Sequence, residues 1–280
     1  MLNSWGLVRV SVADIHREPD HKSEQVTQAI MGMALEILDQ RQNWRYVRLP
    51  DGYLGWVSES LLQLGDEKLV QRWRASPKVM VTSQVALVLS RRQSASIPVS
   101  DAVIGTELLR LETGRRWHRV ALPDGRQGWI AHKDIADVGN LIHIEGGSAE
   151  QILKTAHSFM GLPYLWGGTT PKGFDCSGFV QTVFRLNGFS LPRDASQQFT
   201  QGREVFHRQQ LRPADLVFFK SPDADRITHV AIHIQKGKFI HCSAYIRTNS
   251  LEQSAEDYDA SLEAQYVGAK RVVGGLTGQC

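Results

Sequence analysis

The feature that most constrains the fold is an internal repeat in the first half of the chain. Residues 43–57 (NWRYVRLPDGYLGWV) align with residues 116–130 (RWHRVALPDGRQGWI) at an offset of 73 positions. Each copy predicts a strand, a Pro-Asp-Gly turn and a second strand, because proline and glycine favour the turn and alternating apolar residues supply the strand faces. Further short strands are predicted at residues 35–38 and 108–111. The repeat therefore predicts two small antiparallel barrels of about 60 to 70 residues each.

The tryptophans of the repeat and the tips of its turns are predicted to differ in role. We expect the tryptophans to be core residues, since large aromatic side chains are mostly buried. They are Trp44, Trp56, Trp117 and Trp129. At the turn tip, the first copy has Tyr53 where the second has Arg126. A purely structural repeat need not differ there, so the tip of the first copy is predicted to be specialised.

The repeated pattern resembles the bacterial SH3 (SH3b) domain, which carries the same W-x-x-V, D-G and G-W-[VI] elements. The resemblance covers residues 5–137. It implies two all-β, SH3-like domains, which we place at residues 1–70 and 71–140.

The remaining domain, residues 141–280, has a different pattern. Ser148 and Gln151 form a predicted capping box that opens a helix. A second helix is predicted to begin at Cys176 and to end at Gly188. Strands are predicted at residues 215–219, 228–234, 238–243 and 266–273. Helices followed by several strands are typical of an α+β domain.

The bulk composition excludes several classes of protein. The chain has 32 basic and 29 acidic residues and no basic run, so we expect no nucleic-acid partner. No stretch approaches the roughly 18 apolar residues that span a membrane. Three scattered cysteines are no disulfide framework, and neither they nor the histidines have zinc-site spacing, so we expect no metal and no cofactor. Residues 1–10 lack a leader pattern, so a cytoplasmic protein is expected, or a periplasmic or extracellular one if a leader was removed.

Cys176 is the candidate nucleophile. Its place at a helix start favours the thiolate, because backbone N–H groups and the helix dipole stabilise negative charge there. The alternative is a buried, inert cysteine, which is the interpretation we adopt for Cys242 and Cys280.

Two histidines on neighbouring predicted strands are the candidate partners of the cysteine. If residues 235–237 form a three-residue loop, His241 faces Ala231, and His229 is its diagonal neighbour on the same face of the sheet. A two-residue loop would place the histidines on opposite faces. The pattern permits a relay in which His229 takes the thiol proton and His241 orients the imidazole. The alternative for a lone strand histidine is a structural residue, as His233 could be.

Ordered motifs across this domain resemble those of the NlpC/P60 family of cysteine peptidases. The motifs are P-Y-L-W-G-G at 163–168, F-D-C-S-G-F-V at 174–180, L-P-R at 191–193, P-A-D-L-V-F-F at 213–219 and H-V-A-I at 229–232. The resemblance covers residues 148–273 and implies a papain-like α+β catalytic domain. It implies Cys176 as nucleophile, His229 as base, His241 as orienting residue and Tyr164 as a group that binds the oxyanion or the scissile carbonyl. Ala195 departs from the family, where serine or threonine is common.

The order of the domains resembles a narrower group, the γ-D-glutamyl-L-diamino acid endopeptidases. That group implies a stem-peptide substrate from peptidoglycan, L-Ala-γ-D-Glu-diamino acid, with a free amine on the alanine that is read by a glutamate and a tyrosine of the first SH3b domain. The implied substrate-binding residues are Glu18, Tyr53, Asp175, Ser177, Arg193 and Trp166. Here the family's R-x-E-P turn is shortened to R-E-P at residues 17–19.

Other interpretations stay open. From the sequence alone, a solvated turn residue is the favoured interpretation of Glu18, and the group resemblance reverses this preference. The whole chain could be an exported hydrolase of intact cell wall with SH3b anchors, or a wall-peptide binding protein with an inert third domain. The intact cysteine and histidine set argues against the last. We expect a monomer, and the sequence does not distinguish lysine from diaminopimelate at the diamino acid position.

Overall fold

The computed structural model describes residues 4–138 and 146–274, which fall into two compact units, Met1–His143 and Ile144–Cys280. Each unit is described by itself. The predicted boundary at residues 140 and 141, and the predicted inert Cys280, lie outside the described residues.

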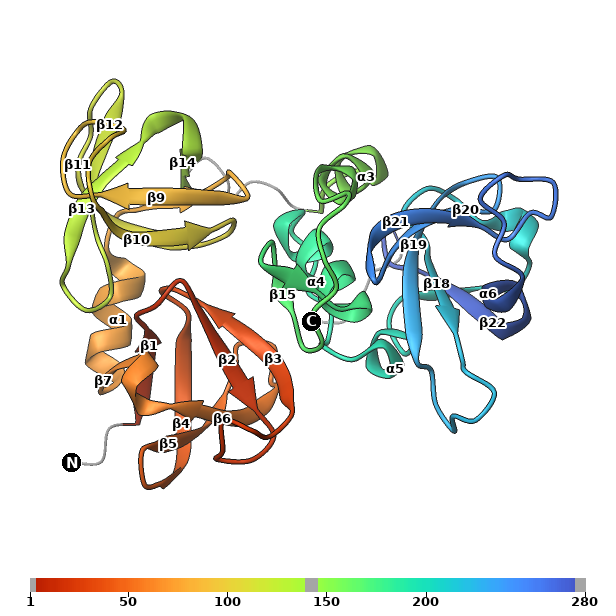
Figure 1. Ribbon diagram of the computed structural model, residues 1–280, viewed down its shortest axis with the longest axis horizontal. Coiled ribbons are helices and arrows are strands. Elements are labelled where there is room, and N and C mark those ends of the chain that lie inside the picture. The colour runs from red at the N-terminus through yellow and green to blue at the C-terminus, as the bar shows by residue number, and fades with distance from the viewer. Residues whose placement is uncertain (1–3, 139–145, 275–280) are drawn as a thin grey trace. The chain divides into compact units, whose positions relative to one another are not determined.

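The first unit contains two seven-stranded antiparallel sheets (Figure 1). The first sheet comprises β1 (Trp5–Val8), β2 (Val12–His16), β3 (Gln25–Ile30), β4 (Ala34–Arg41), β5 (Trp44–Arg48), β6 (Leu54–Ser58) and β7 (Leu62–Gly65). The second comprises β8 (Lys78–Val81), β9 (Val85–Leu89), β10 (Pro98–Val103), β11 (Glu107–Glu112), β12 (Trp117–Ala121), β13 (Gln127–Ala131) and β14 (Ile135–Asp137). The strand order is β3-β2-β6-β5-β4-β1-β7 in one sheet and β10-β9-β13-β12-β11-β8-β14 in the other. The second order repeats the first, strand for strand.

The predicted hairpins are present in both copies. β5 pairs with β6, and β12 pairs with β13, each around the Pro-Asp-Gly turn. Gly52 and Gly125 have φ values of 84° and 85°, a left-handed conformation that glycine adopts without steric cost. A short 3-10 helix follows each hairpin, η1 (Glu59–Leu61) and η2 (His132–Asp134).

The core prediction for the tryptophans is correct in the first copy and wrong in the second. Trp44 and Trp56 are buried, whereas Trp117 and Trp129 are only partly buried. In β12 the alternation buries His118 instead, which turns Trp117 toward the surface. The guanidinium of Arg92 covers the ring of Trp129, 3.9 Å from its centroid, in place of a core.

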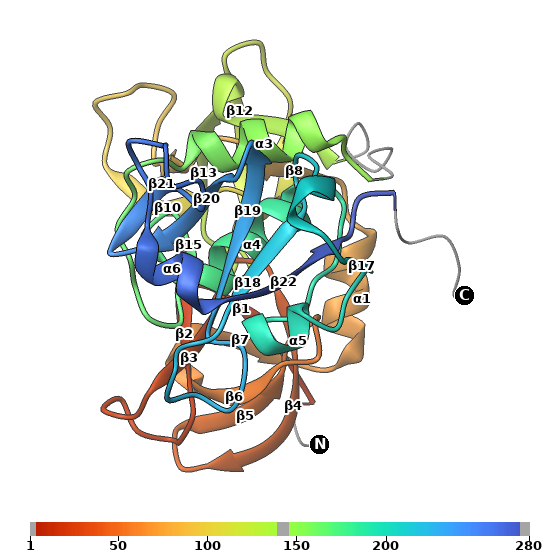
Figure 2. The same ribbon diagram turned by 90° about the vertical axis from the view of Figure 1, so that its right-hand side faces the viewer.

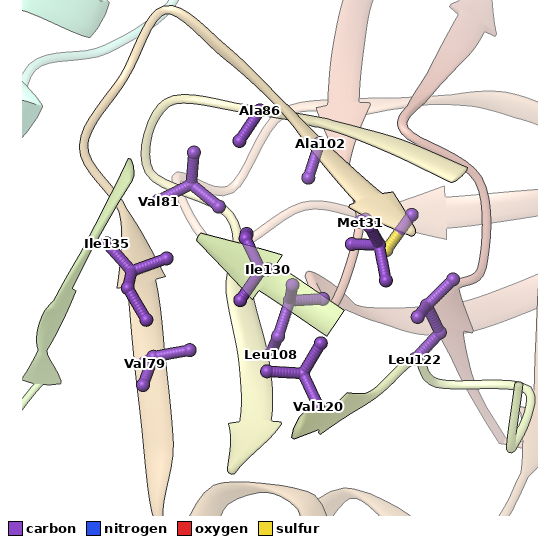
Figure 3. Packing of buried hydrophobic residues seen from close by; sticks show 11 residues of the cluster. Met31, Val79, Val81, Ala86, Ala102, Leu108, Val120, Leu122, Ile130 and Ile135 are labelled. Carbon is purple, nitrogen blue, oxygen red and sulfur yellow. The ribbon is translucent and has the colours of Figure 1, made fainter. Parts of the chain in front are cut away.

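The two sheets share hydrophobic packing. Met31, from the turn between β3 and β4, is 1% exposed and belongs to the core of the second sheet, where it lies near Ala102, Leu108 and Leu122 (Figure 3). Helix α1 (Glu67–Ala75) connects the sheets and begins at the N-cap Asp66. It covers residues 70 and 71, the predicted boundary between the copies, and buries apolar side chains against the first sheet.

The second unit is an α+β domain, as predicted. Its elements are α3 (Ala149–Ser158), β15 (Thr169–Thr170), β16 (Gly173–Phe174), α4 (Cys176–Leu186), α5 (Ala195–Gln198), β17 (Arg203–Val205), η3 (Arg208–Gln210), β18 (Leu216–Phe219), β19 (His229–Gln235), β20 (Lys238–Ser243), β21 (Tyr245–Ser250), α6 (Ala260–Gln265) and β22 (Tyr266–Arg271). The six-stranded sheet has the order β17-β22-β18-β19-β20-β21. Helix α4 packs against β19 and β20 (Figure 2), which brings the start of the helix to the sheet.

The helix signals in this unit are confirmed. Ser148 and Gln151 make the reciprocal hydrogen bonds of the capping box that opens α3. α4 begins at Cys176, and Gly188 follows its end with a φ of 82°. Strands β17 and β21 and helices α5 and α6 were not predicted.

Candidate active site

Cys176 occupies the first position of α4. Asp175 is the N-cap, and its Oδ1 accepts a hydrogen bond from the backbone N–H of Gly178 at 2.7 Å. The sulfur is buried and lies 3.9 Å from the carbonyl oxygen of Thr228, directly before β19. Gly178 allows the first turn of α4 to pack against the loop at Gly168, because a Cβ at residue 178 would lie 2.1 Å from the carbonyl oxygen of Gly168. The D-C-S-G motif is thus a helix start pressed against a neighbouring loop.

Asp175, Ser177 and Arg193, three of the predicted substrate-binding residues, form one buried cluster. Arg193 donates to Oδ1 of Asp175 at 3.1 Å and to Oδ2 at 2.5 Å. Arg193 also donates to Ser177 Oγ at 2.9 Å, and Ser177 Oγ lies 3.3 Å from Asp175 Oδ1. The backbone N–H of Gly167 donates to Oδ2 at 3.0 Å. The negative charge of Asp175 is therefore already paired inside the domain.

The rings of His229 and His241 are hydrogen-bonded to each other. His229 Nε2 lies 2.8 Å from His241 Nδ1, and the ring planes meet at 79°. His229 packs on Phe219 and His241 on Phe239, which support the rings from the same face of the sheet. The predicted pairing of the two histidines on one face is confirmed.

The loop between them is not the three-residue loop considered above, and a bulge produces the shared face instead. Gln235 pairs with Lys238, so the turn consists of Lys236 and Gly237, both left-handed with φ values of 47° and 72°. Such a two-residue turn alone would place the histidines on opposite faces. An irregularity in the register between His233 and Gln235 compensates for it, because the extra residue of a bulge shifts the alternation by one.

Asn249 completes this group and was missed by the sequence reasoning. Its Oδ1 lies 3.0 Å from His241 Nε2, and its Nδ2 donates to the carbonyl oxygen of Asp257 at 3.2 Å. Asn249 lies on β21, which pairs with β20 along its whole length. The only signal for this strand is the alternation of Ile246 with polar neighbours, and it is too short to stand out.

Burial dominates the protonation of the site. It raises the pKa of the Cys176 thiol to about 12, with the Asp175 carboxylate adding to the rise. It lowers the pKa of His229 to about 3, helped by His241 and Arg247, and the pKa of His241 to about 4. Cysteine and histidines are therefore neutral near pH 7. Burial thus opposes the thiolate that the helix start favours, because desolvation penalises the charged form.

Tyr164 and Trp166 flank the same motif but differ in exposure. Tyr164 is half-buried, and its backbone N–H donates to the carbonyl oxygen of Ala244 at 2.9 Å. Burial, and then the nearby Cys176, raise the pKa of Tyr164, so its phenol keeps its proton and can donate a hydrogen bond. Trp166 is 60% exposed.

Glu18 and Tyr53 belong to the first unit. Glu18 is exposed in the turn between β2 and β3, where its backbone N–H and carbonyl are both hydrogen-bonded to Ser23 Oγ. Tyr53 is half-buried directly before β6. β2 and β6 are antiparallel, with His16 opposite Trp56, so the last residue of β2 and the first residue of β6 lie at the same end of these two strands, which we call one edge of the sheet. Glu18 and Tyr53 extend from this edge.

Arg126, the counterpart of Tyr53, has a structural role. Its guanidinium donates to the carbonyl oxygens of Arg9 at 3.1 Å and Val99 at 3.0 Å, and it is also held by Asp124. Arg9 precedes β2 of the first sheet. The tip of the second copy therefore contacts the first copy.

The residues predicted to be bystanders are buried and bonded. The sulfur of Cys242 lies 3.0 Å from the carbonyl oxygen of Phe174, and His233 Nδ1 lies 2.9 Å from that of Arg212. Over residues 4–138 and 146–274, no three metal-ligating side chains are gathered in one place. Within the same ranges, no helix combines the length and the apolar character needed to cross a membrane.

Two family models match the chain. The model of the NlpC/P60 family matches residues 161–265, and that of the bacterial dipeptidyl-peptidase Sh3 domain matches residues 15–62. The chain is 31% identical over 256 residues to a gamma-D-glutamyl-L-lysine dipeptidyl-peptidase of Bacillus cereus, covering 88% of this chain and 74% of the relative. The chain belongs to the NlpC/P60 family. NlpC/P60 members are cysteine peptidases, so the protein is an enzyme of this class.

Further relatives extend the NlpC/P60 assignment over both units. Dipeptidyl-peptidase 6 of Lysinibacillus sphaericus is 27% identical over 272 residues, 91% of this chain and 95% of the relative. The crystal structure of an NlpC/P60 family protein from Bacillus cereus matches with a TM-score of 0.81 and 25% identity, over 96% of this chain and 100% of that one. The likeness therefore includes the SH3-like part as well as the catalytic domain.

Proposed function

We propose that this protein hydrolyses the γ-D-glutamyl bond to an L-diamino acid in peptides derived from peptidoglycan, with Cys176 as nucleophile and His229 as general base. The observation that carries the proposal is a buried cysteine at a helix start, with its sulfur 3.9 Å from the carbonyl oxygen of Thr228, next to His229, whose ring is hydrogen-bonded to that of His241. The relatives of this chain include gamma-D-glutamyl-L-lysine dipeptidyl-peptidases.

The reaction follows from the neutral resting state of the site. As the sulfur of Cys176 attacks the γ-carbonyl carbon, its proton passes to His229, so thiolate and imidazolium form only as the new C–S bond forms. The N-terminal end of α4 and the Tyr164 hydroxyl stabilise the oxyanion. His229 then gives its proton to the leaving amine, which leaves a thioester on Cys176. Water, deprotonated by His229, hydrolyses the thioester and restores the thiol.

Selection of a free N-terminal alanine is the second part of the proposal. An ammonium taken out of water needs a carboxylate partner. Arg193 already neutralises Asp175, so Asp175 supplies polar acceptors and little net charge. Glu18 has no ion pair within the described residues, and it extends from the same sheet edge as Tyr53. We assign recognition of the amine to Glu18 and Tyr53, and contacts with the rest of the dipeptide to Ser177 and Trp166.

The domain organisation that goes with this function is also proposed. Residues 1–70 and 71–140 are two SH3b domains, and residues 141–280 the catalytic domain. The equal strand orders of the two sheets support the second SH3b assignment. We propose that the enzyme acts as a monomer.

The test is digestion of synthetic L-Ala-γ-D-Glu-L-Lys and L-Ala-γ-D-Glu-diaminopimelate, followed by mass spectrometry. The expected products are L-Ala-D-Glu and the free diamino acid. Intact cell wall and N-acetylated peptides serve as comparison substrates. Cleavage of intact wall in preference to the free peptides would overturn hydrolysis of released stem peptides as the function and favour a wall hydrolase.

A further inference from the structure

In each hydrogen bond around His229 and His241, the neighbouring groups determine which partner donates and which accepts. The chain of contacts runs from His229 Nε2 to His241 Nδ1 at 2.8 Å, from His241 Nε2 to Asn249 Oδ1 at 3.0 Å, and from Asn249 Nδ2 to the carbonyl oxygen of Asp257 at 3.2 Å. Three side chains thus connect the catalytic strand β19 to a backbone carbonyl.

The last group of this hydrogen-bond network, the carbonyl oxygen of Asp257, can act only as an acceptor. A carbonyl oxygen accepts hydrogen bonds and cannot donate them. The Asp257 carbonyl therefore requires the amide NH₂ of Asn249 to face it, and it is itself held by the backbone N–H of Ser250 at 2.9 Å. Since the NH₂ is used there, the amide oxygen of Asn249 faces His241.

The orientation of the Asn249 amide then determines the tautomers of both imidazole rings. An amide oxygen accepts, so Nε2 of neutral His241 carries the proton and its Nδ1 is a lone pair. That lone pair requires a proton on His229 Nε2. His229 Nδ1 is left unprotonated, as the nitrogen that can take a proton from a thiol.

We infer that Asn249 is a positioning residue, which, anchored on the Asp257 carbonyl, selects the tautomer of His241 and through it makes Nδ1 of His229 the basic nitrogen. The inference rests on the proposed roles of Cys176 and His229. It adds β21 and the segment after it, which carry no reacting group, to the parts of the domain that determine the rate.

Charged groups near the relay bear on its protonation. The Arg247 guanidinium, opposite His241 in the register of β20 and β21, lowers the pKa of both histidines, and the Asp259 carboxylate raises that of His241. Burial keeps both rings neutral, which is the condition under which the tautomer matters.

Two isosteric variants of Asn249 test the inference. Asn249→Leu removes both hydrogen bonds, so both tautomers of the pair become available. An outright wrong tautomer in a comparable relay costs about 10⁴-fold in rate, and a released one should cost less, about tenfold to a hundredfold in kcat with little change in KM. Asn249→Asp keeps the acceptor for His241 and adds a charge, so it should recover part of kcat and shift the acid limb of the pH profile upward. Thr248→Val, its neighbour on the opposite face of β21, is the matched control and should retain wild-type kcat.

A readout without substrate separates this inference from the proposed reaction. In the wild-type protein, ¹⁵N NMR of labelled histidine should show His229 protonated at Nε2 and not at Nδ1, whereas Asn249→Leu should give a mixture. A wild-type His229 protonated at Nδ1, or an Asn249→Leu variant with unchanged tautomer and kcat, would overturn the inference. A wild-type enzyme that cleaves none of the peptides would instead contradict the proposed function and leave the tautomer measurement valid.

Discussion

Both oxygens of the Asp175 carboxylate are held by Arg193, at 3.1 and 2.5 Å, inside the catalytic domain. Arg193 is 2% exposed, and the Asp175 side chain is also the N-cap of α4. One buried ion pair therefore fixes the start of the helix that carries Cys176.

Removing the cation should destabilise this domain strongly. Arg193→Met leaves a buried carboxylate without its partner, which costs about 3 to 5 kcal/mol of unfolding free energy. Urea unfolding followed by far-UV circular dichroism measures the loss. Arg185→Met, at an exposed position of α4, is the control and should change the stability by less than about 0.5 kcal/mol. Equal effects of the two substitutions would mean that the ion pair has no special role.

Cys176→Ser should abolish essentially all hydrolysis and leave the fold intact, because a serine hydroxyl is a much weaker nucleophile than a thiol in the same place. Iodoacetamide should label Cys176 ahead of Cys242, whose side chain is fully buried. Mass spectrometry of the labelled peptides measures the order. An active serine variant, or labelling of Cys242 first, would remove Cys176 from the reaction.

Stability should fall on acidification through the buried histidines. The pKa of His229 is lowered to about 3 and that of His241 to about 4, both below the ordinary value of 6.5. Between the lowered pKa values and 6.5, the unfolded chain binds more protons than the folded one. Stability is therefore full above about pH 6.5 and is lost as the pH falls toward 4. Each histidine contributes up to about 1.4 kcal/mol per pH unit.

Urea unfolding at pH 7.5 and pH 5 tests this dependence. The variant with His229→Gln and His241→Gln together should lose less stability between the two pH values than the wild type. His207→Gln, at an exposed position, is the control and should behave like the wild type. Identical pH dependence in the double variant and the wild type would contradict the pKa directions of these two rings.

Glu18→Ala should reduce cleavage of the peptide with a free alanine amine and narrow its advantage over the N-acetylated peptide. In the wild type we expect acetylation to cost roughly a few-hundred-fold in kcat/KM, because the acetylated peptide has no ammonium group to pair with the Glu18 carboxylate in the complex. The ratio of kcat/KM for the two peptides is the measurement. Glu67→Ala, at an exposed position at the start of helix α1, should leave the ratio unchanged. Equal cleavage of both peptides by the wild type would refute the proposed amine site.

Met31→Ala should destabilise both sheets of the first unit at once. The side chain is 1% exposed within the core of the second sheet although it belongs to the first, and such a truncation typically costs about 2 to 5 kcal/mol. Differential scanning calorimetry of the full chain should show the unfolding transition of the first unit moving to lower temperature as a single transition. Met33→Ala, on the partly buried side chain two residues later, should cost less.

The parts of this fold that were predictable are those specified by neighbouring residues. The Pro-Asp-Gly turns, the capping box of Ser148 and the helix start at Cys176 depend on a few adjacent positions, and all are present. The face shared by His229 and His241 was predicted correctly, although a two-residue turn with a bulge takes the place of the three-residue loop, because both arrangements give the same register beyond the turn.

The unpredictable parts depend on burial and on contacts between distant segments. The protonation of Cys176 is set by how much of the domain covers it, which a helix-start pattern does not report. Asn249 becomes part of the site only because β21 adds to the sheet beside β20. The partly exposed Trp117 and Trp129 show that equal motifs in two copies need not be equally buried.

The contacts of Met31 and Arg126 limit how this part of the chain can be recombined with other proteins. Each side chain reaches from one SH3-like sheet into or onto the other, so we expect the two sheets to be exchangeable only as one piece. A chimera that replaced the first sheet alone would leave a cavity where Met31 sits and would change the segment whose Arg9 carbonyl oxygen accepts a hydrogen bond from Arg126. Exchange of specificity between relatives should therefore succeed when both sheets are transplanted together, or when only the side chains of the Glu18 turn are changed.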